Sequence, residues 1–421
     1  MAAKILLGAA ILVLITAMSG CGTKGCSTAT PGSTGGPSGG TSGGSTPPGG
    51  GCSLTGTGGG LNNTQSALVY FMDGDAGQLA AEGLNINSAG TFASVVNFVP
   101  PQMPSHVDDG GIVIVGQKYL YVALSNASTG SVFGFSIDGT TGALSALNNS
   151  PYAVPGLLNQ VGGGPAAFSI AADPAGKFVF VGDASAMTVL AVNPNDGSLS
   201  TTDSIPLPGG MGAPQQMATD GLGKYLYAVD GISIAQFSYN ASGLLTPLGV
   251  LTSSVSNMAM MTGEPSGKWM LGVTGEVGQN GPPDKNVYVF QIGSTGTLAS
   301  AIPTATPFPP AYVVVSPNDK FVYTFNEDDT DITNPTFLQP IVGFTFDISS
   351  GALTNPTPFP DVLSNIGHID QSGQVVFAAG QSSVATAAGM IPVSVLSDGT
   401  LTSSSSHAGL PSFSFAVTDV P

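Results

Sequence analysis

A short turn of the form small or polar residue, Gly, any residue, Leu recurs along the chain, and it limits the possible folds more than any other feature. Its seven copies begin at Ala76, Thr141, Asp196, Ser242, Thr295, Ser350 and Asp398. From Gly77 to Gly399 the six intervals average about 54 residues. In such a turn the glycine supplies a positive φ, and the leucine returns the chain to a hydrophobic layer.

A second motif recurs between these turns. It consists of an acidic residue or Ser, a Pro-x-Gly type of turn, Lys, and then an aromatic-hydrophobic-aromatic strand. Clear copies begin at Asp173, Asp220, Glu264 and Ser316, and weaker copies contain Lys118 and Gln374. Five of the eight lysines occupy this one position, so we expect them to be structural, with the stem packed on an edge and the ammonium in water. The acidic residue is expected to cap N–H groups of the turn.

Together the two motifs predict an all-β fold. Each period holds strand, turn, strand, loop, strand, turn and strand, and the strands alternate apolar and polar residues with no helical period between them. Four antiparallel strands in about 45–60 residues are typical of one blade of a β-propeller. We therefore predict a seven-bladed β-propeller over residues 61–421. A last strand in 412–419 should pair with the strand at 67–71, so that the N- and C-terminal strands close the ring.

The first 60 residues have a different composition. Lys4 followed by an apolar run over 5–18 predicts a signal peptide at 1–20, because the run is too short to span a bilayer. The sequence Met18-Ser19-Gly20-Cys21 resembles the lipobox of bacterial lipoproteins, which implies cleavage before Cys21 and lipidation of that cysteine. The alternative is a soluble secreted protein in which Cys21 has no such role. Gly22 favours delivery to the outer membrane or cell surface.

Residues 21–60 predict a flexible linker, since 27–60 hold no charged residue and are dominated by Gly, Ser, Thr and Pro. Cys26 and Cys52 flank much of this segment. In an oxidising compartment they could form a disulfide, and two free thiols are the equal alternative.

The charge balance excludes some partners. Eight lysines and no arginine oppose 25 acidic residues, for a net charge of -17. Nucleic acid and anionic membrane surfaces both require clustered cations, so neither is expected as a partner. Contact with a membrane is expected through the lipid anchor alone, and we expect a monomer.

The second motif, followed by an alternating strand and the Gly-x-Leu turn, resembles the lactonase-type seven-bladed β-propeller family, which includes 6-phosphogluconolactonase-like proteins. The resemblance covers nearly all of 67–421. It implies a lactone-hydrolysing site built from His, Arg and acidic residues in a central cleft. This chain has no arginine, which disfavours that activity and phosphorylated substrates in particular.

Two groups of residues are candidates for chemistry. His368 lies on an expected inner strand facing the channel and is the best general base, with Asp370 as a nearby carboxylate; a hydrogen-bonded structural histidine is the alternative. Glu327, Asp328, Asp329 and Asp331 form an acidic segment that could bind Ca²⁺, or that could simply be solvated. The three histidines lack the close spacing of a zinc site, and no other cofactor is expected.

Two functions follow from these observations. The first is a lipid-anchored binding or interaction module of the cell envelope, with a glycan, a small lactone or an envelope protein as partner. The alternative is a lactonase-like hydrolase acting on a sugar lactone in the central funnel, with His368 as its base.

Overall fold

A computed structural model provides the structure of the chain. It describes residues 65–73, 78–85, 91–98, 110–125, 130–139, 142–154, 169–183, 185–251, 258–274, 284–327, 338–382, 385–403 and 414–419. The chain divides into two compact units, 1–53 and 54–421, and all described residues belong to the second. The predicted signal peptide (1–20) and linker (21–60) therefore lie outside them. Within the described ranges, no helix has the length and apolar character needed to cross a bilayer.

Four sheets follow one another between residues 110 and 305, and sequential strands pair antiparallel in each. The first consists of β4 (Gly110–Val115), β5 (Tyr119–Ser125), β6 (Gly130–Ile137) and β7 (Leu144–Ala146), with β8 (Tyr152–Ala153) also pairing with β6. The second consists of β9 (Ser169–Ala172), β10 (Phe178–Gly182), β11 (Ala186–Val192) and β12 (Leu199–Pro206).

The third and fourth sheets have the same four-stranded order. The third consists of β13 (Gln216–Thr219), β14 (Tyr225–Val229), β15 (Ile234–Tyr239) and β16 (Leu245–Leu251), after the short 3-10 turn η2 (Pro208–Gly210). The fourth consists of β17 (Met260–Gly263), β18 (Trp269–Val273), β19 (Asn286–Gln291) and β20 (Ile302–Ala305).

A seven-stranded sheet comes next. It consists of β21 (Pro310–Val315), β22 (Phe321–Glu327), β23 (Leu338–Asp347), β24 (Ala352–Ile369), β25 (Val375–Ser382), β26 (Ala385–Val395) and β27 (Leu401–Ser403). The 18-residue β24 pairs mainly through its first half with β23 and through its second half with β25. This shared strand divides the sheet into two groups of four strands.

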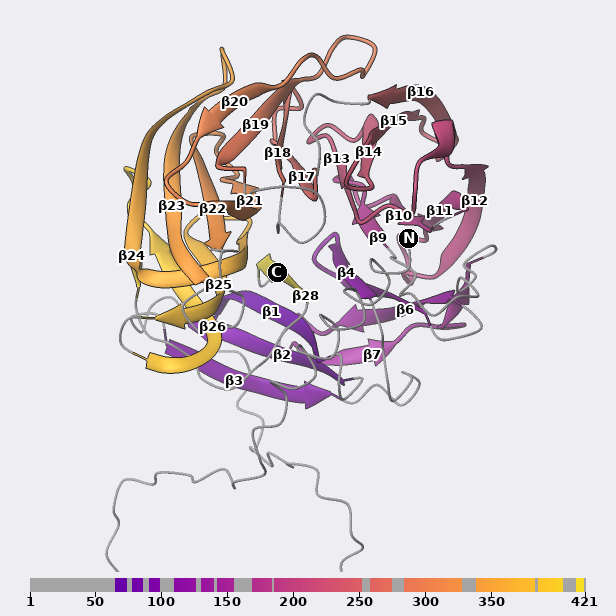
Figure 1. Cartoon of the computed structure of the whole chain (residues 1–421). Coiled ribbons are helices and arrows are strands. Elements are labelled where there is room, and N and C mark those ends of the chain that lie inside the picture. The colour runs from indigo at the N-terminus through magenta and orange to yellow at the C-terminus, as the bar shows by residue number, and fades with distance from the viewer. Residues whose placement is uncertain are drawn as a thin grey trace, which may run out of the picture. The chain divides into compact units, whose positions relative to one another are not determined.

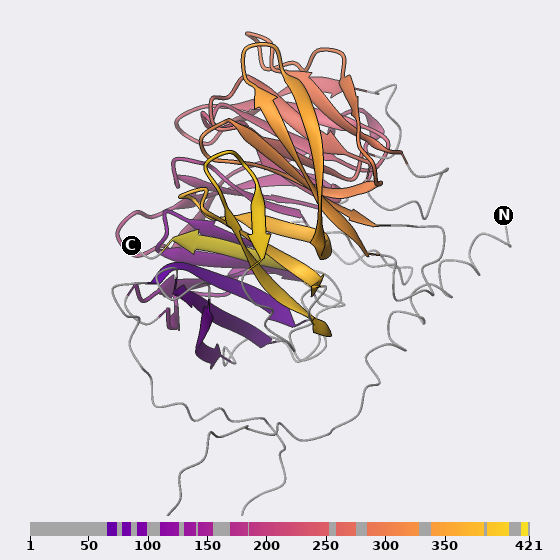
Figure 2. The same ribbon diagram turned by 90° about the vertical axis from the view of Figure 1, so that its left-hand side faces the viewer.

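The last sheet joins the two ends of the described chain. It consists of β28 (Ser414–Asp419), β1 (Gln65–Asp73), β2 (Gln78–Asn85) and β3 (Thr91–Phe98), in that order. β28 and β1 run antiparallel, with Ala67 opposite Asp419 and Met72 opposite Ser414. In the colour ramp of Figures 1 and 2, this is where yellow lies beside indigo. The predicted all-β fold of four-stranded antiparallel sheets is confirmed, and the described strands make seven such groups when β24 is counted in both of its groups.

One strand of each group lies nearest the centre. These inner strands contact each other in the order β28, β4, β9, β13, β17, β21 and β24, and β24 in turn contacts β28. Figure 1 shows the sheets following one another around this centre. The molecule's core is therefore a series of apolar layers between neighbouring sheets. Val179 and Tyr121 pack in one such layer, and Phe180 and Leu226 pack in the next.

The turns after the inner strands explain the second sequence motif. Asp220 is fully buried, and its carboxylate accepts hydrogen bonds of 2.7 Å from the backbone N–H groups of Lys224 and Tyr225. Glu264 is equally buried and accepts a 2.9 Å hydrogen bond from the N–H of Trp269. The predicted capping role of this position is confirmed, because the buried carboxylate accepts hydrogen bonds from the N–H groups of its turn.

Candidate functional site

The inner strands carry a cavity of about 680 Å³ along their central side. Its lining includes residues of β4, β9, β13, β17, β21 and β24. Side chains alternate along a strand, so the second and fourth residues before each capped turn face the same way. The second residues are Ala171, Ala218, Thr262, Val314 and His368, and the fourth are Ser169, Gln216, Met260, Tyr312 and Ile366. All ten line the cavity, together with residues between them such as Ile170, Met217 and Val313, so the inner strands before the capped turns form its wall.

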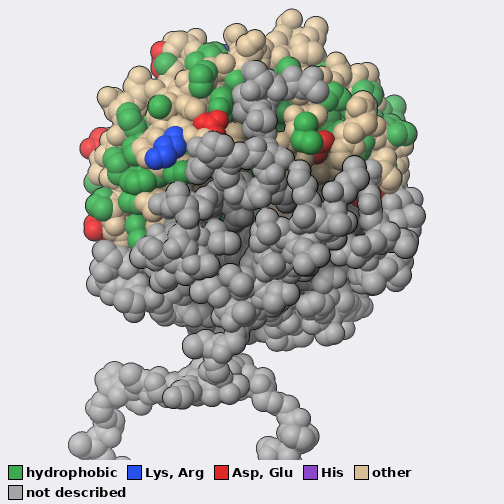
Figure 3. All heavy atoms as spheres, viewed as in Figure 1, with side chains coloured by type: hydrophobic (Ala, Val, Ile, Leu, Met, Phe, Trp, Pro, Cys, Tyr) green, Lys and Arg blue, Asp and Glu red, His purple; other side chains and the backbone are tan. Residues whose placement is uncertain are grey.

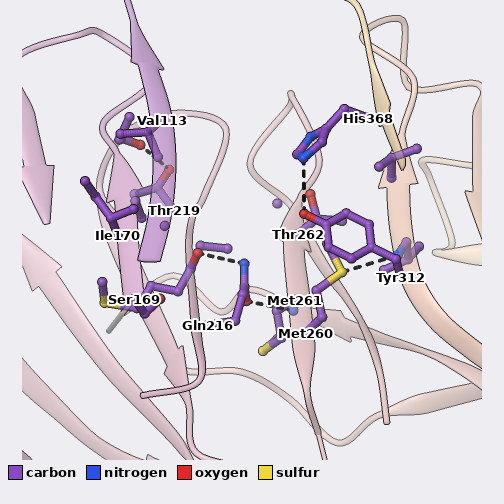
Figure 4. Close-up of a pocket in the computed structure, with 18 of the residues that line it drawn as sticks. Val113, Ser169, Ile170, Gln216, Thr219, Met260, Met261, Thr262, Tyr312 and His368 are labelled. Atoms are coloured by element: carbon purple, nitrogen blue, oxygen red, sulfur yellow. Dashed lines mark hydrogen bonds between the residues drawn. The ribbon is translucent and has the colours of Figure 1, made fainter. Parts of the chain in front are cut away.

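His368 lies where the sequence placed it, on an inner strand and in the lining of the central cavity. It is half-buried, and its Nε2 atom lies 3.5 Å from the hydroxyl oxygen of Tyr312. The two rings are T-shaped, with their centroids 5.6 Å apart. Figure 4 shows this pair on one side of the cavity, with Thr262 beside it.

Tyr312 was not identified from the sequence. Burial raises the pKa of its phenol to about 12, so the hydroxyl keeps its proton at neutral pH and can donate a hydrogen bond. Its place in the repeat was the available signal, since Tyr312 stands four residues before Ser316, the capping residue of its turn. Its meeting with His368, 56 residues later, depends on the packing of the inner strands β21 and β24 against each other.

Asp370, the predicted carboxylate partner, has a different environment. It is fully buried in the turn after β24, where its Oδ1 atom accepts 2.8 Å hydrogen bonds from the N–H groups of Gln374 and Val375. Ser372 donates its hydroxyl to the other carboxylate oxygen. Asp370 is not among the described residues that line the cavity. The structure therefore brings His368 together with Tyr312, and it commits the Asp370 carboxylate to its turn.

Two polar side chains of the lining connect inner strands. Gln216 on β13 accepts a 2.9 Å hydrogen bond from the N–H of Met261 on β17, and its Nε2 donates to the carbonyl oxygen of Met217 at 2.7 Å. Thr219 donates to the carbonyl oxygen of Ala172 on β9 at 3.1 Å. These bonds fix the spacing of three neighbouring inner strands and hence the width of the cavity on that side.

Charge is scarce around the cavity. In the described lining, Asp220 is the one carboxylate, and both of its oxygens accept hydrogen bonds from its own turn. No lysine is part of this lining. The lysines at the repeat position are exposed at Lys118, Lys177, Lys224, Lys268 and Lys320. Figure 3 shows the same scarcity among the coloured atoms of one face of the molecule. The cavity thus offers neutral hydrogen-bonding groups and apolar surface to a ligand.

Several predicted residues lie outside the described ranges. They are Cys21, Cys26, Cys52, Asp328, Asp329 and Asp331. Glu327 is the last residue of β22, where it pairs with Leu338. In the part of the chain that the structure describes, no three His, Cys, Asp or Glu side chains gather as a metal site would require.

The chain resembles known proteins in structure but not detectably in sequence. No protein-family model matches the chain, and no curated protein matches it in sequence. A candidate 6-phosphogluconolactonase from Bacteroides fragilis superposes with a TM-score of 0.59 at 15% identity, over 84% of this chain and 98% of that one. The periplasmic gluconolactonase PpgL of Pseudomonas aeruginosa gives 0.57 at 15% identity, over 85% and 99%.

This chain has the fold of the lactonase-type β-propellers. A further match, a protein from Lactobacillus plantarum, superposes with a TM-score of 0.60 at 15% identity, over 84% of this chain and 99% of that one. The predicted resemblance is therefore confirmed at the level of the lactonase-type fold. Because a fold hosts many activities, the function has to be argued from the cavity itself.

Proposed function

We propose that this chain is an exported β-propeller that binds a small, uncharged molecule in its central cavity. The observation that carries the proposal is the neutral lining. A cavity of about 680 Å³ lies at the meeting point of the inner strands, and its described walls contain no cation and no carboxylate that lacks hydrogen bonds of its own. Cavities of this size with a few convergent polar groups are typical of ligand sites.

The same lining disfavours anionic ligands. A phosphate or carboxylate group that leaves water needs a paired cation or several N–H donors, and burial without them costs several kcal/mol. The repeat lysines cannot supply this charge, since they are exposed in turns and are absent from the described lining. A phosphorylated sugar lactone is therefore not the expected ligand.

The experiment is a comparison of matched ligands with the purified chain. Glucono-δ-lactone, its 6-phosphate and a set of neutral lactones are titrated and followed by thermal shift and calorimetry. We expect saturable binding of at least one neutral compound and none of the phosphorylated one. Tighter binding of the phosphorylated lactone, or no binding of any neutral compound, contradicts the proposal. Mass spectrometry of natively purified protein adds a direct search for a retained ligand.

Lactone hydrolysis is the second candidate function, and the contact between His368 and Tyr312 favours it. His368 would accept a proton from water as the water oxygen attacks the lactone carbonyl, while Tyr312 donates a hydrogen bond to the carbonyl oxygen as it becomes negative. The ring C–O bond then breaks, and the departing oxygen takes the proton to give a hydroxy acid. Asp370 takes no part in this scheme, since its carboxylate caps a turn.

Acid release across the lactone panel tests hydrolysis. Turnover that His368→Ala abolishes and that a control, Tyr225→Phe, retains would support it; Tyr225 donates its hydroxyl to the carbonyl oxygen of Ser294, away from the cavity. Absence of turnover across the panel, together with neutral-ligand binding, would leave binding as the function.

We also propose that the chain is exported and anchored through a lipid on Cys21. The lipobox-like sequence at 18–21 and the preceding apolar run support this, as does the fold shared with a periplasmic protein. Intact mass of the mature chain tests it, because a lipidated N-terminal Cys21 adds the mass of its acyl chains and Cys21→Ser removes them. A mature chain of unmodified mass beginning elsewhere contradicts the anchor. Alkylation with and without reductant shows in the same sample whether Cys26 and Cys52 form a disulfide.

A further inference from the structure

The cavity lining is mainly apolar, and its polar groups are unevenly distributed. Its polar side chains in the described chain are Ser169, Gln215, Gln216, Thr219, Asp220, Thr262, Tyr312 and His368. Gln216, Thr219 and Asp220 hold inner strands or a turn together through the hydrogen bonds given above. Gln215 is exposed and precedes β13, at the end away from the Asp220 turn.

The remaining polar groups gather mostly on one side. Thr262 on β17, Tyr312 on β21 and His368 on β24 come from three consecutive inner strands. Figure 4 shows the three side chains directed toward one another. All three are half-buried, so each presents part of its surface to the cavity. We call Thr262, Tyr312 and His368 the polar cluster.

The opposite side is mainly apolar, and the hydroxyl of Thr219, which lies there between Val113 and Ile170, is already donated to the carbonyl oxygen of Ala172. Val113 on β4 is half-buried, and Ile170 and Ala171 on β9 are 9% and 6% exposed. Figure 4 shows Val113 and Ile170 across the cavity from the polar cluster. Ser169 is the polar exception on β9, and it is only 5% exposed. We call Val113, Ile170 and Ala171 the apolar wall.

We infer that the cavity selects an uncharged amphiphile, whose carbonyl or hydroxyl end meets the polar cluster and whose hydrocarbon body lies against the apolar wall. This inference rests on the proposed function and names the class of ligand. A hydroxylated sugar ring fits less well, because it carries polar groups around its whole circumference. Hydroxyls facing the apolar wall would lose their water without gaining a partner, which weakens binding.

The test is a homologous series of neutral lactones that differ only in alkyl length. δ-Hexalactone, δ-octalactone and δ-decalactone are titrated into the purified chain, with methyl β-glucopyranoside as the neutral polyol. We expect the dissociation constant to fall by about fourfold for each added methylene group, since each one removes apolar surface from water. The polyol should bind at least about tenfold more weakly than δ-decalactone. A dissociation constant that does not change with alkyl length, or a polyol that binds more tightly, overturns the inference.

Variants locate the two ends of the ligand. Tyr312→Phe and Thr262→Val each remove one hydroxyl from the polar cluster without changing side-chain shape much, and each should weaken all three lactones by a similar factor. Val113→Thr adds a hydroxyl to the apolar wall, so it should weaken δ-decalactone more than δ-hexalactone. The control Tyr225→Phe removes a phenol hydroxyl outside the cavity and should change none of the constants. Unchanged binding of δ-decalactone in all three cavity variants would place it elsewhere and overturn the inference.

The result separates this inference from the proposed function. Saturable binding of the polyol together with weak binding of all alkyl lactones refutes the amphiphile and leaves a neutral-ligand site. Absence of binding by the polyol, the alkyl lactones and glucono-δ-lactone alike refutes both. A circular dichroism spectrum and melting temperature for each variant show that a lost affinity reflects the cavity rather than unfolding.

Discussion

The phenol hydroxyl of Tyr121 donates a 2.6 Å hydrogen bond to the backbone carbonyl oxygen of Gly197, 76 residues later in the chain. Tyr121 is the second aromatic residue of its motif on β5, and Gly197 belongs to the Gly-x-Leu turn of the next sheet. The same bond recurs in other sheets. It joins Tyr70 to Gly142 at 2.9 Å, Tyr227 to Gly296 at 2.7 Å and Tyr323 to Gly399 at 3.1 Å. The two sequence motifs are thus the two halves of one contact between neighbouring sheets.

Tyr121→Phe tests the strength of this contact. The substitution keeps the ring and leaves a buried carbonyl without its donor, so we expect a loss of about 1–2 kcal/mol in the free energy of unfolding. Tyr119→Phe is the control, since its hydroxyl donates at 3.4 Å to the exposed carbonyl of Pro194, and it should cost less than about 0.5 kcal/mol. Denaturant unfolding of both variants measures the difference. Equal losses would show that the buried bond contributes nothing specific.

Two structural features require glycine at position 197 of this turn. Gly197 has φ +72°, and a Cβ atom there would overlap the ring of Tyr119 from the preceding sheet. Gly197→Ala should therefore destabilise the chain by more than about 2 kcal/mol, from backbone strain and from displacement of the ring. Gly210→Ala separates the two effects, because Gly210 has φ +74° with nothing within 4 Å of the added atom. That control should cost about 1 kcal/mol, and melting curves of the pair provide the measurement.

Asp370→Asn distinguishes a capping role from a catalytic one. The amide keeps only one acceptor oxygen, so it cannot accept from Ser372 as well as from Gln374 and Val375, and stability should fall by about 1–3 kcal/mol. Ligand affinity per folded molecule should be unchanged. His368→Asn should show the reverse pattern, with lost affinity and a smaller effect on unfolding. If folded Asp370→Asn loses ligand affinity, measured well below its melting temperature, then the carboxylate of Asp370 takes part in ligand binding.

Asp319 and Glu264 lie near each other in the turns of two neighbouring sheets. Their interaction makes the free energy of unfolding depend on pH. Burial and the nearby Glu264 carboxylate raise the pKa of Asp319 to about 6, while Lys268 opposes the shift. A carboxyl whose folded pKa is raised favours the folded state when protonated. Its contribution is fully present below its ordinary pKa near 4, and it is lost as the pH rises through 6.

Asp319→Asn is expected to remove this dependence. The wild-type free energy of unfolding should fall by about 1 kcal/mol between pH 4 and pH 7 at this site, after screening of the partly exposed group by solvent, and the variant should lack that component. Asp361→Asn, at an exposed carboxyl on β24, is the control. Unfolding titrations at several pH values measure both. Parallel profiles for wild type and Asp319→Asn would contradict the expectation.

Much of the fold could be predicted because its contacts repeat. Each inner-strand turn needs a cap for the same N–H groups, so Asp173, Asp220 and Glu264 recur at one position in sequence. The continuous strand β24 was not foreseen. Pro356, Pro358 and Pro360 suggest a loop, yet this stretch forms the outer strand of its group, where a missing N–H donor is tolerated.

The site was predictable only in part. The position of His368 follows from its own repeat, because the inner strand that precedes each capped turn lines the cavity. Its neighbour Tyr312 does not follow, since nothing in either local sequence says that two inner strands bring these side chains within 3.5 Å.

By itself the amino-acid sequence determined the strands, their turns and the small share of charged residues, because these depend on residues close together in the chain and on composition. The tertiary structure alone decided which neutral side chains meet. Thr262, Tyr312 and His368 meet on one side of the cavity because their three inner strands, β17, β21 and β24, pack side by side. That arrangement is a property of packing between sheets, and no single repeat carries it.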